Sequence, residues 1–121
     1  MIGIGVDAVE VARMREVMAR TPGFAKRVFT EEEIAALAGR EDPTPSFAVR
    51  FAAREAVMKA LGVGLGAFDL HDVSVERTSH GEPRLVVRGR AERLARERGI
   101  SKWFLSLTHT ESVAMAMVAA E

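Results

Sequence analysis

The sequence predicts a single α+β domain over residues 1–121, in which a mostly antiparallel sheet packs against one long central helix. Three observations support this fold class. Both ends of the chain alternate large and small residues with the period of a strand, the alanine-rich centre has the period of a helix, and a turn containing glycine and proline divides a further β-like segment. The length suits one domain with a modest core.

The first element is a strand over Ile2–Val9, because its residues alternate between two kinds of side chain. One face carries Ile2, Ile4, Val6 and Ala8, and the other carries Gly3, Gly5, Asp7 and Val9. Glycine replaces larger side chains on the face of Asp7. We therefore expect something bulky to approach beside this carboxylate.

Helices are expected in the next part of the chain. Residues Glu10–Arg20 carry an apolar stripe and end at a Thr-Pro-Gly sequence. A second helix runs through about Ala38, because Thr30 and Glu33 have the spacing of a capping box. The long helix follows a polar loop and covers Ser46–Leu61, with Ser46 as its expected cap and a glycine-rich stop after it.

The C-terminal half is expected to form strands around one helix. A turn signal at His80–Pro83 makes a hairpin of the two segments that flank it. The last segment is ambiguous, because its alanine and methionine content favours a helix, whereas alternation of Met115 and Met117 with small alanines favours a buried strand. We interpret it as a strand. The expected strands are Leu70–Thr78, Arg84–Arg88, Trp103–Thr110 and Val113–Ala120, and the helix is Arg90–Arg98.

Composition excludes several classes of function. Seventeen basic and seventeen acidic residues give no net charge, so no overall field attracts nucleic acid or an anionic membrane. The absence of cysteine excludes disulfides, thiolate metal sites and a cysteine nucleophile. No apolar run has the length of a membrane span, and the N-terminus lacks signal-peptide features. We expect a cytoplasmic protein without a nucleic-acid or membrane partner.

The most informative segment is the helix around Glu55 and Lys59, which are four residues apart on one side. Glu55 falls between Phe51 and Met58, on a strip expected to be buried. One interpretation is an ordinary surface ion pair, worth roughly 0.2–0.5 kcal/mol. The other is that Glu55 binds a metal and Lys59 a phosphate. The second interpretation requires another carboxylate, because one side chain rarely holds a hard cation.

Two further segments complete a candidate constellation. Asp7 supplies a carboxylate on the glycine face, and Ser106–Thr110 ends a strand with hydroxyl groups and His109. Each segment also has a structural interpretation. Asp7 could end its strand by accepting turn hydrogen bonds, and His109 could be a core or turn residue.

In this order the motifs resemble the holo-acyl-carrier-protein synthase family of 4′-phosphopantetheinyl transferases. The resemblance rests on a GIGxDxxExxR opening, a FAAKEAxxKAxG helix, a G-x-P turn and an S-x-[ST]-H-T ending. These correspond to Gly3–Glu10 with Arg13, to Phe51–Gly62, to Gly81–Pro83 and to Ser106–Thr110. Arg54 replaces the usual lysine of the helix motif, so we treat it only as a possible phosphate contact.

The resemblance implies an α+β transferase fold and a reaction in the service of fatty acid biosynthesis. The 4′-phosphopantetheine arm of coenzyme A moves to a serine of apo acyl carrier protein, and adenosine 3′,5′-bisphosphate leaves. Asp7 and Glu55 would bind Mg²⁺, and Lys59 would contact the coenzyme A diphosphate; Glu55 and Lys59 are the implied catalytic residues. The base that accepts the serine proton is either Glu55 or a metal-bound water.

The resemblance also implies binding residues. Coenzyme A contacts are expected from Arg50 at the 3′-phosphate, from Gly81 and Pro83 around the adenine, and from Thr108, His109 and Thr110 at the phosphates. The acidic carrier protein is expected to dock on Arg13, Val17, Arg20 and Phe24. The family further implies a homotrimer with active sites between subunits. The sequence alone does not assign each coenzyme A contact to one subunit or its neighbour.

Three other functions use the same residues. A metal-dependent phosphohydrolase would replace the serine by water at Asp7, Glu55 and Lys59. A non-catalytic coenzyme A or nucleotide sensor would bind partners through its arginine-bearing first helix. In a purely structural homo-oligomer, the charged residues would form salt bridges between subunits.

Overall fold

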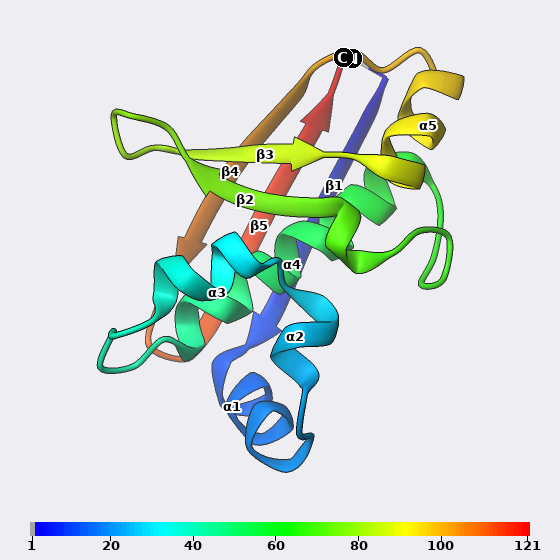
Figure 1. The fold of residues 1–121 in the computed structure, drawn as a ribbon. Coiled ribbons are helices and arrows are strands. Elements are labelled where there is room, and N and C mark those ends of the chain that lie inside the picture. Colours follow the sequence, from blue (N-terminus) through cyan, green and yellow to red (C-terminus); the bar gives the residue numbers. More distant parts are fainter. Residues whose placement is uncertain (1) are drawn as a thin grey trace.

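The computed structural model describes residues 2–121 and confirms the α+β class. Helices and antiparallel strands follow one another as in Figure 1. The elements are β1 (Gly3–Glu10), α1 (Val11–Arg20), α2 (Phe24–Val28), α3 (Glu31–Leu37), α4 (Thr44–Leu61), the 3₁₀ helix η1 (Leu70–Asp72), β2 (Val73–Arg77), β3 (Pro83–Val87), α5 (Gly89–Glu97), β4 (Trp103–His109) and β5 (Val113–Ala120).

The strands form two antiparallel sheets instead of the one that the sequence suggested. A three-stranded sheet has the order β1-β5-β4, and β2 and β3 form a separate hairpin. The central position of β5 confirms that Val113–Ala120 is a strand. Its residue Ala116 is the register partner of both Asp7 and Leu107, so these three residues form one row across the sheet.

Helix α4 packs directly against the glycine face of β1. A Cβ atom added to Gly3 or Gly5 would clash with the carbonyl oxygens of Ala60 or Ala56. The bulky object expected beside Asp7 is therefore this helix, and the glycine face is not open to a ligand. Small residues on both elements allow the two backbones to approach closely.

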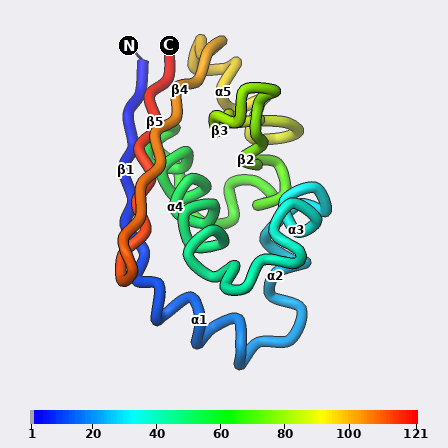
Figure 2. Tube along the Cα trace, turned by 90° about the vertical axis from the view of Figure 1, so that its left-hand side faces the viewer, coloured from blue at the N-terminus to red at the C-terminus, as the bar shows by residue number. Residues whose placement is uncertain are grey.

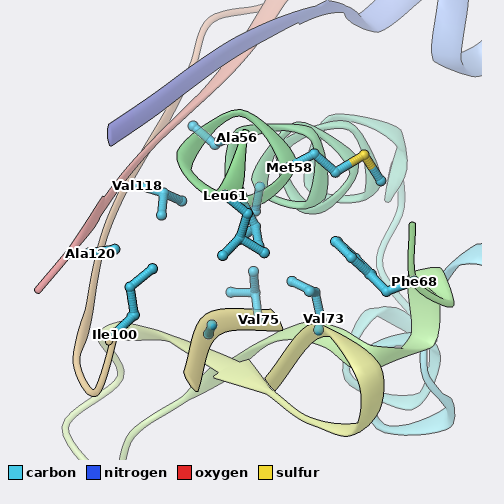
Figure 3. Packing of buried hydrophobic residues seen from close by; sticks show 14 of the residues in the cluster. Ala56, Met58, Leu61, Phe68, Val73, Val75, Ile100, Val118 and Ala120 are labelled. Carbon is cyan, nitrogen blue, oxygen red and sulfur yellow. The ribbon is translucent and has the colours of Figure 1, made fainter. Parts of the chain in front are cut away.

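The main core lies between α4 and the two sheets. Figure 3 shows Leu61 of α4 between Val118 of β5 on one side and Val73 and Val75 of β2 on the other. Burial of each such aliphatic side chain contributes about 1.5–3 kcal/mol. Because α4 contacts both sheets, it fixes the positions of the polar residues that it carries.

Helix α4 begins two residues earlier than expected, at Thr44, with Pro45 in its first turn. Proline suits this position because the first turn of a helix leaves backbone N–H groups without partners. Ser46 does not cap the helix; its hydroxyl oxygen accepts a hydrogen bond from Arg40 Nη1 at 2.8 Å. Gly62 ends the helix in the left-handed conformation at φ 70°, as its position in the sequence indicated.

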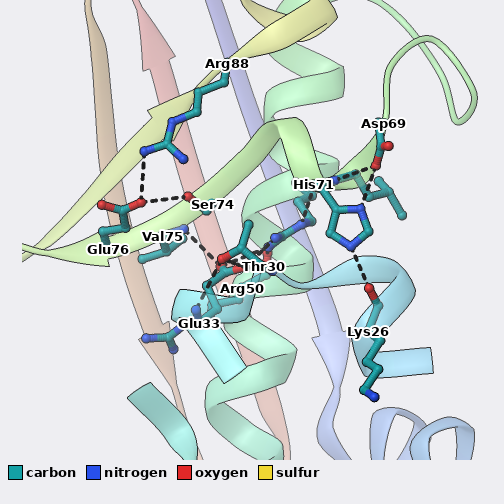
Figure 4. A network of polar contacts seen from close by, with 12 residues as sticks. Lys26, Thr30, Glu33, Arg50, Asp69, His71, Ser74, Val75, Glu76 and Arg88 are labelled. Carbon is teal, nitrogen blue, oxygen red and sulfur yellow. Dashed lines mark hydrogen bonds and ion pairs between the residues drawn. The ribbon is translucent and has the colours of Figure 1, made fainter. Parts of the chain in front are cut away.

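A buried ion pair connects α3 to α4. The side chains of Glu33 and Arg54 are both fully buried, and Arg54 Nη1 lies 3.1 Å from Glu33 Oε2. The same carboxylate accepts a hydrogen bond from the Val75 amide of β2 at 3.0 Å (Figure 4). Arg54 Nε donates to the Leu70 carbonyl at 2.9 Å. Arg54 is thus enclosed by protein groups and is not accessible to a phosphate. The capping box of Thr30 and Glu33 is confirmed.

A surface ion pair positions α1 against the start of α4. Both terminal nitrogens of Arg15 contact the carboxylate of Asp42, at 2.9 and 3.0 Å. Hydrogen bonding to this guanidinium lowers the pKa of Asp42 to about 2. Asp42 also accepts a hydrogen bond from the Thr44 amide, the first residue of α4.

The outer face of the three-stranded sheet is apolar and exposed. Figure 2 shows α4 on one face of this sheet and no element of the described chain on the other. Large side chains on the outer face include Ile2, Ile4, Val6, Phe104, Met115 and Met117, which are 40–58% exposed. Among the described helices, none is long and apolar enough to cross a membrane.

Candidate active site

Asp7 lies near the end of β1 and faces α4, as the alternation of this strand requires. Its side chain is 18% exposed and accepts a hydrogen bond from Lys59 Nζ at 3.2 Å. The same ammonium group donates to the Val6 carbonyl at 2.9 Å. Lys59 therefore joins α4 to β1, and its half-exposed side chain also remains accessible to solvent.

Glu55 lies one helical turn before Lys59 and is half-buried, between half-buried Phe51 and buried Met58. Within residues 2–121 it forms no ion pair, because Lys59 contacts Asp7 instead. The ordinary surface pair between Glu55 and Lys59 is thus not formed. Burial raises the pKa of Glu55, the negative charge of Asp7 raises it further, and Lys59 opposes both effects.

Asp7 and Glu55 face a common cavity of about 420 Å³. Besides these two carboxylates, the cavity is lined by Ala8, Val9 and a third acidic residue, Glu10, from β1, and by Arg13, Met14, Val17, Phe24 and Phe51 from α1, α2 and α4. Three of the four residues expected to bind a carrier protein are therefore next to the acidic pair. The fourth, Arg20, lies on the surface of α1 and forms an ion pair with Glu16 at 2.8 Å.

Asp7 and Glu55 are the residues of this cavity that could hold a magnesium ion shared with a phosphate ligand, because both supply carboxylate oxygens. Across the described part of the chain, no group of three or more His, Cys, Asp or Glu side chains is placed to enclose a metal. Mg²⁺ does not need such a group, since it is usually bound by one or two carboxylates together with substrate phosphates and water. Burial is the main cause of the raised pKa of Glu55, and the negative charge of Asp7 adds to it; a cation beside the two carboxylates would oppose this second effect.

Arg50 lies in a different cavity, of about 330 Å³, between α3, α4 and β2. Only 3% of the residue is exposed, and its Nη1 donates to the Ser46 carbonyl at 3.1 Å. Its Nε is buried without a hydrogen-bond partner among the described atoms. Burial lowers the pKa of Arg50.

The Gly81–Pro83 turn lies at the tip of the β2–β3 hairpin. Gly81 has a φ of 87°, in the left-handed region that favours glycine, and its amide donates to the Thr78 carbonyl. The Gly81 carbonyl accepts a hydrogen bond from Arg77 Nη1 at 2.6 Å. Since Arg77 also lines the cavity of Arg50, this hydrogen bond links the turn to that cavity, whereas no residue of the turn lines the cavity of Glu55.

The residues at the end of β4 form a third group. Thr108 and His109 are exposed, and neither lines the two cavities. Thr110 stabilises the turn to β5, because its hydroxyl oxygen accepts hydrogen bonds from the amides of Ser112 and Val113, at 3.3 and 3.1 Å. The predicted site residues thus occupy three separate places on one chain.

Sequence reasoning did not identify several lining residues. Met14 and Phe51 complete the apolar wall of the acidic cavity, and Arg40 and Arg77 line the cavity of Arg50. Met14 belongs to the apolar stripe of the first helix, which was a usable signal. The two arginines had no local signal, because they approach Arg50 only through the folding of α3 and the hairpin.

The chain is similar to known proteins over nearly its whole length. Residues 3–118 match the 4′-phosphopantetheinyl transferase superfamily. A holo-[acyl-carrier-protein] synthase of Moorella thermoacetica is 41% identical over 121 residues, which are 100% of this chain and 94% of that protein. The synthase of Frankia casuarinae is 46% identical over 121 residues, which are 100% of this chain and 98% of that protein.

Solved structures give the same result. The holo-[acyl-carrier-protein] synthase of Neisseria meningitidis superposes with a TM-score of 0.88 at 32% identity, covering 100% of this chain and 98% of that one. A synthase of Bacillus anthracis, solved in complex with CoA (3′,5′-ADP), has a TM-score of 0.81 at 30% identity, covering 98% and 95%. Sequence and fold agree: the chain belongs to the 4′-phosphopantetheinyl transferase superfamily.

Proposed function

We propose that this protein transfers the 4′-phosphopantetheine group of coenzyme A to a serine of apo acyl carrier protein. The products are holo acyl carrier protein and adenosine 3′,5′-bisphosphate, and the reaction serves fatty acid biosynthesis. Relatives that match the whole chain are holo-[acyl-carrier-protein] synthases, and one was solved with coenzyme A. The observation that carries the proposal is the acidic pair of Asp7 and Glu55, with Lys59 beside it, in the cavity that reaches Arg13.

Asp7 and Glu55 would hold Mg²⁺ between β1 and α4. Magnesium bound there would neutralise charge on the diphosphate while the nucleotide leaves. Glu55 is suited to this role because it has no ion pair to give up, as the described contacts show. Asp7 is fixed by its hydrogen bond from Lys59, so its carboxylate is oriented before the ligands bind.

Lys59 would bind an oxygen of the coenzyme A diphosphate. Its ammonium group has three donors, and the contacts to Asp7 and to the Val6 carbonyl use two of them. The third donor is available to a ligand in the half-exposed position of this side chain. A lysine fixed in this way orients the phosphate and stabilises negative charge on the leaving group.

The carrier protein would dock on α1 and the start of α2. Arg13, Val17 and Phe24 line the cavity that contains the acidic pair, and Arg20 adds a basic group further along α1. A carrier helix on this surface would bring its serine towards Asp7 and Glu55. Basic groups around an apolar groove suit an acidic partner, because opposite charges accelerate association and apolar contacts hold the complex.

We also propose a homotrimer in which two subunits form each active site. The exposed apolar face of the three-stranded sheet is the surface that assembly would bury. Arg50 lies in a cavity apart from Asp7 and Glu55, and the Gly81–Pro83 turn is linked to that cavity through Arg77, so a neighbouring subunit would supply these coenzyme A contacts. Thr108, His109 and Thr110 would contact coenzyme A phosphates. A single domain in the cytoplasm remains the prediction from sequence.

Mass spectrometry of the carrier protein tests the proposal. Apo acyl carrier protein is incubated with coenzyme A, Mg²⁺ and either the wild type, Asp7→Asn or the surface control Arg93→Ala. The expected result is addition of phosphopantetheine with the wild type and the control, and little or none with Asp7→Asn. Hydrolysis of coenzyme A without modification of the carrier would support a phosphohydrolase, and binding without turnover would support a sensor. Either outcome would overturn the transferase proposal.

A further inference from the structure

The cavity of Arg50 contains more positive charge than Arg50 alone provides. Arg40 and Arg77 line it together with Arg50, while its carboxylates are Glu32 and Glu76. One of these acids already has partners, because Glu76 accepts a hydrogen bond from the Ser74 hydroxyl at 3.3 Å and lies 3.6 Å from Arg88 (Figure 4). Three guanidinium groups therefore line one cavity with two carboxylates, and one of these carboxylates is already partnered.

The pKa of Arg50 also reflects the neighbouring positive charges in this cavity. Burial has the largest effect and lowers the pKa of Arg50; the charge of Glu33 raises it, and the charges of Arg77, Arg40 and Arg54 each lower it. Its Nε is buried and has no partner among residues 2–121. A buried charged group with an unpartnered donor is costly, and a negative charge in the cavity beside Arg50 would offset part of this cost. The site is thus suited to a dianionic phosphate monoester.

Arg77 is held in a defined position at this cavity. Its Nη1 donates to the Gly81 carbonyl at 2.6 Å, and no carboxylate of the described chain lies within ion-pair distance of it. A guanidinium group has five N–H donors, so Nη2 and Nε remain available. The hairpin turn therefore holds the Arg77 side chain at the cavity that Arg50 also lines.

We infer that Arg77 is a specificity residue for the 3′-phosphate of coenzyme A. It would give a second guanidinium to the phosphate monoester at Arg50, and the Gly81 carbonyl would keep it oriented. This inference rests on the proposed function for the identity of the nucleotide. It assigns to Arg77 the discrimination between nucleotides with and without a 3′-phosphate.

Isothermal titration calorimetry with two nucleotides tests the inference. Adenosine 3′,5′-bisphosphate and adenosine 5′-monophosphate are titrated into the wild type, Arg77→Ala, Arg77→Lys and the exposed control Arg93→Ala. A hydrogen bond between charged groups is worth about 1.5–3 kcal/mol, which corresponds to about a 10- to 150-fold change in affinity. We expect Arg77→Ala to lose affinity for the bisphosphate in this range and to bind the monophosphate within about twofold of wild type. The affinity of Arg77→Lys for the bisphosphate should lie between the affinities of the wild type and Arg77→Ala, because lysine keeps the charge but not the planar geometry.

Two results would overturn the inference. Arg77→Ala could bind the bisphosphate as tightly as the wild type, or it could lose both nucleotides equally, which would indicate a role in the turn alone. Failure of the wild type to prefer the bisphosphate would also contradict it. The test is separate from that of the proposed function, because a wild type that discriminates between the nucleotides but does not modify the carrier would contradict the transferase and leave the inference intact.

Discussion

At the scale of single residues, the acidic pair is maintained against its own electrostatics. Asp7 and Glu55 carry like charges, and Glu55 has no ion pair within the described structure. Lys59 compensates only one of them through a direct contact. Such an arrangement is typical of functional sites, where a bound cation supplies the missing charge.

Glu55→Gln should therefore have opposite effects on activity and stability. The pKa of Glu55 is raised in the folded state, so the folded protein binds this proton more readily than the unfolded chain. Stability is gained as the pH falls through this raised pKa, and the ionised group opposes folding above it. The glutamine variant should lose most activity but melt at a temperature equal to or above that of wild type at pH 7, without bound ligands.

Thermal melts across a pH series check this prediction. The difference in melting temperature between Glu55→Gln and the wild type should shrink as the pH falls towards 4.5, the ordinary pKa of this carboxyl group. Glu97→Gln, an exposed change on α5, serves as the control and should show no such trend. A glutamine variant that is markedly less stable than wild type at pH 7 would show that Glu55 has a structural role instead.

At the scale of elements, the contact between β1 and α4 brings Asp7 beside Lys59. Gly5→Ala tests this contact, because its Cβ would clash with the Ala56 carbonyl of the helix backbone. Overpacking of this kind costs typically about 1–3 kcal/mol of the free energy of unfolding. Urea denaturation should show the loss. Gly64→Ala, where an added Cβ meets no other atom within 4 Å, is the matched control, and equal stability of the two variants would contradict the close packing.

The ion pair of Glu33 and Arg54 is the second element-scale feature. Removal of one partner from a buried pair costs roughly 3–5 kcal/mol, because the other charge remains buried without compensation. Glu33→Gln should therefore be strongly destabilised, and the double variant Glu33→Gln/Arg54→Met should recover part of the loss. Urea denaturation of the single and double variants measures this coupling. If the two single changes were simply additive, the pair would have no special role in joining α3, α4 and β2.

Several elements were predictable because their signals are local. The capping box of Thr30 and Glu33 lies within four residues, and the alternation around Met115 and Met117 correctly identified β5. The partners of Glu33 were not predictable, since Arg54 is 21 residues away and Val75 is 42. The same holds for the division of the strands into two sheets, which depends on how each packs on α4.

For the site, the sequence predicted which residues take part better than it predicted which of them lie together in one chain. The spacing of Glu55 and Lys59 correctly placed both on one side of α4, but Lys59 pairs with Asp7 across to β1. Arg50 is five residues before Glu55, which rotates it by about 140° around the helix. This geometry explains why Arg50 and Glu55 line different cavities.

At the scale of the whole molecule, assembly would unite these separated groups. If one subunit supplies Asp7 and its neighbour supplies Arg50, two inactive variants should complement each other. Asp7→Asn and Arg50→Gln are dissociated, mixed in equal amounts and reassembled. Random trimers should regain about a quarter of the wild-type rate, because one site in four combines two intact halves.

The transfer assay on the mixture measures this recovery. Each variant alone, taken through the same dissociation and reassembly, provides the baseline. Mixed trimers that form, as native mass spectrometry would show, but that have no more activity than the baseline would place both residues of each site on one subunit. The proposal of a shared site would then be wrong.

Asp7 and Glu55 together are proposed to bind one magnesium ion beside the coenzyme A diphosphate. The most direct measurement is calorimetric titration of Mg²⁺ into protein saturated with coenzyme A. We expect Asp7→Asn and Glu55→Gln each to weaken Mg²⁺ binding by at least about tenfold, and Glu97→Gln to bind Mg²⁺ as the wild type does. Magnesium affinity that is unchanged in both carboxylate variants would contradict this proposal.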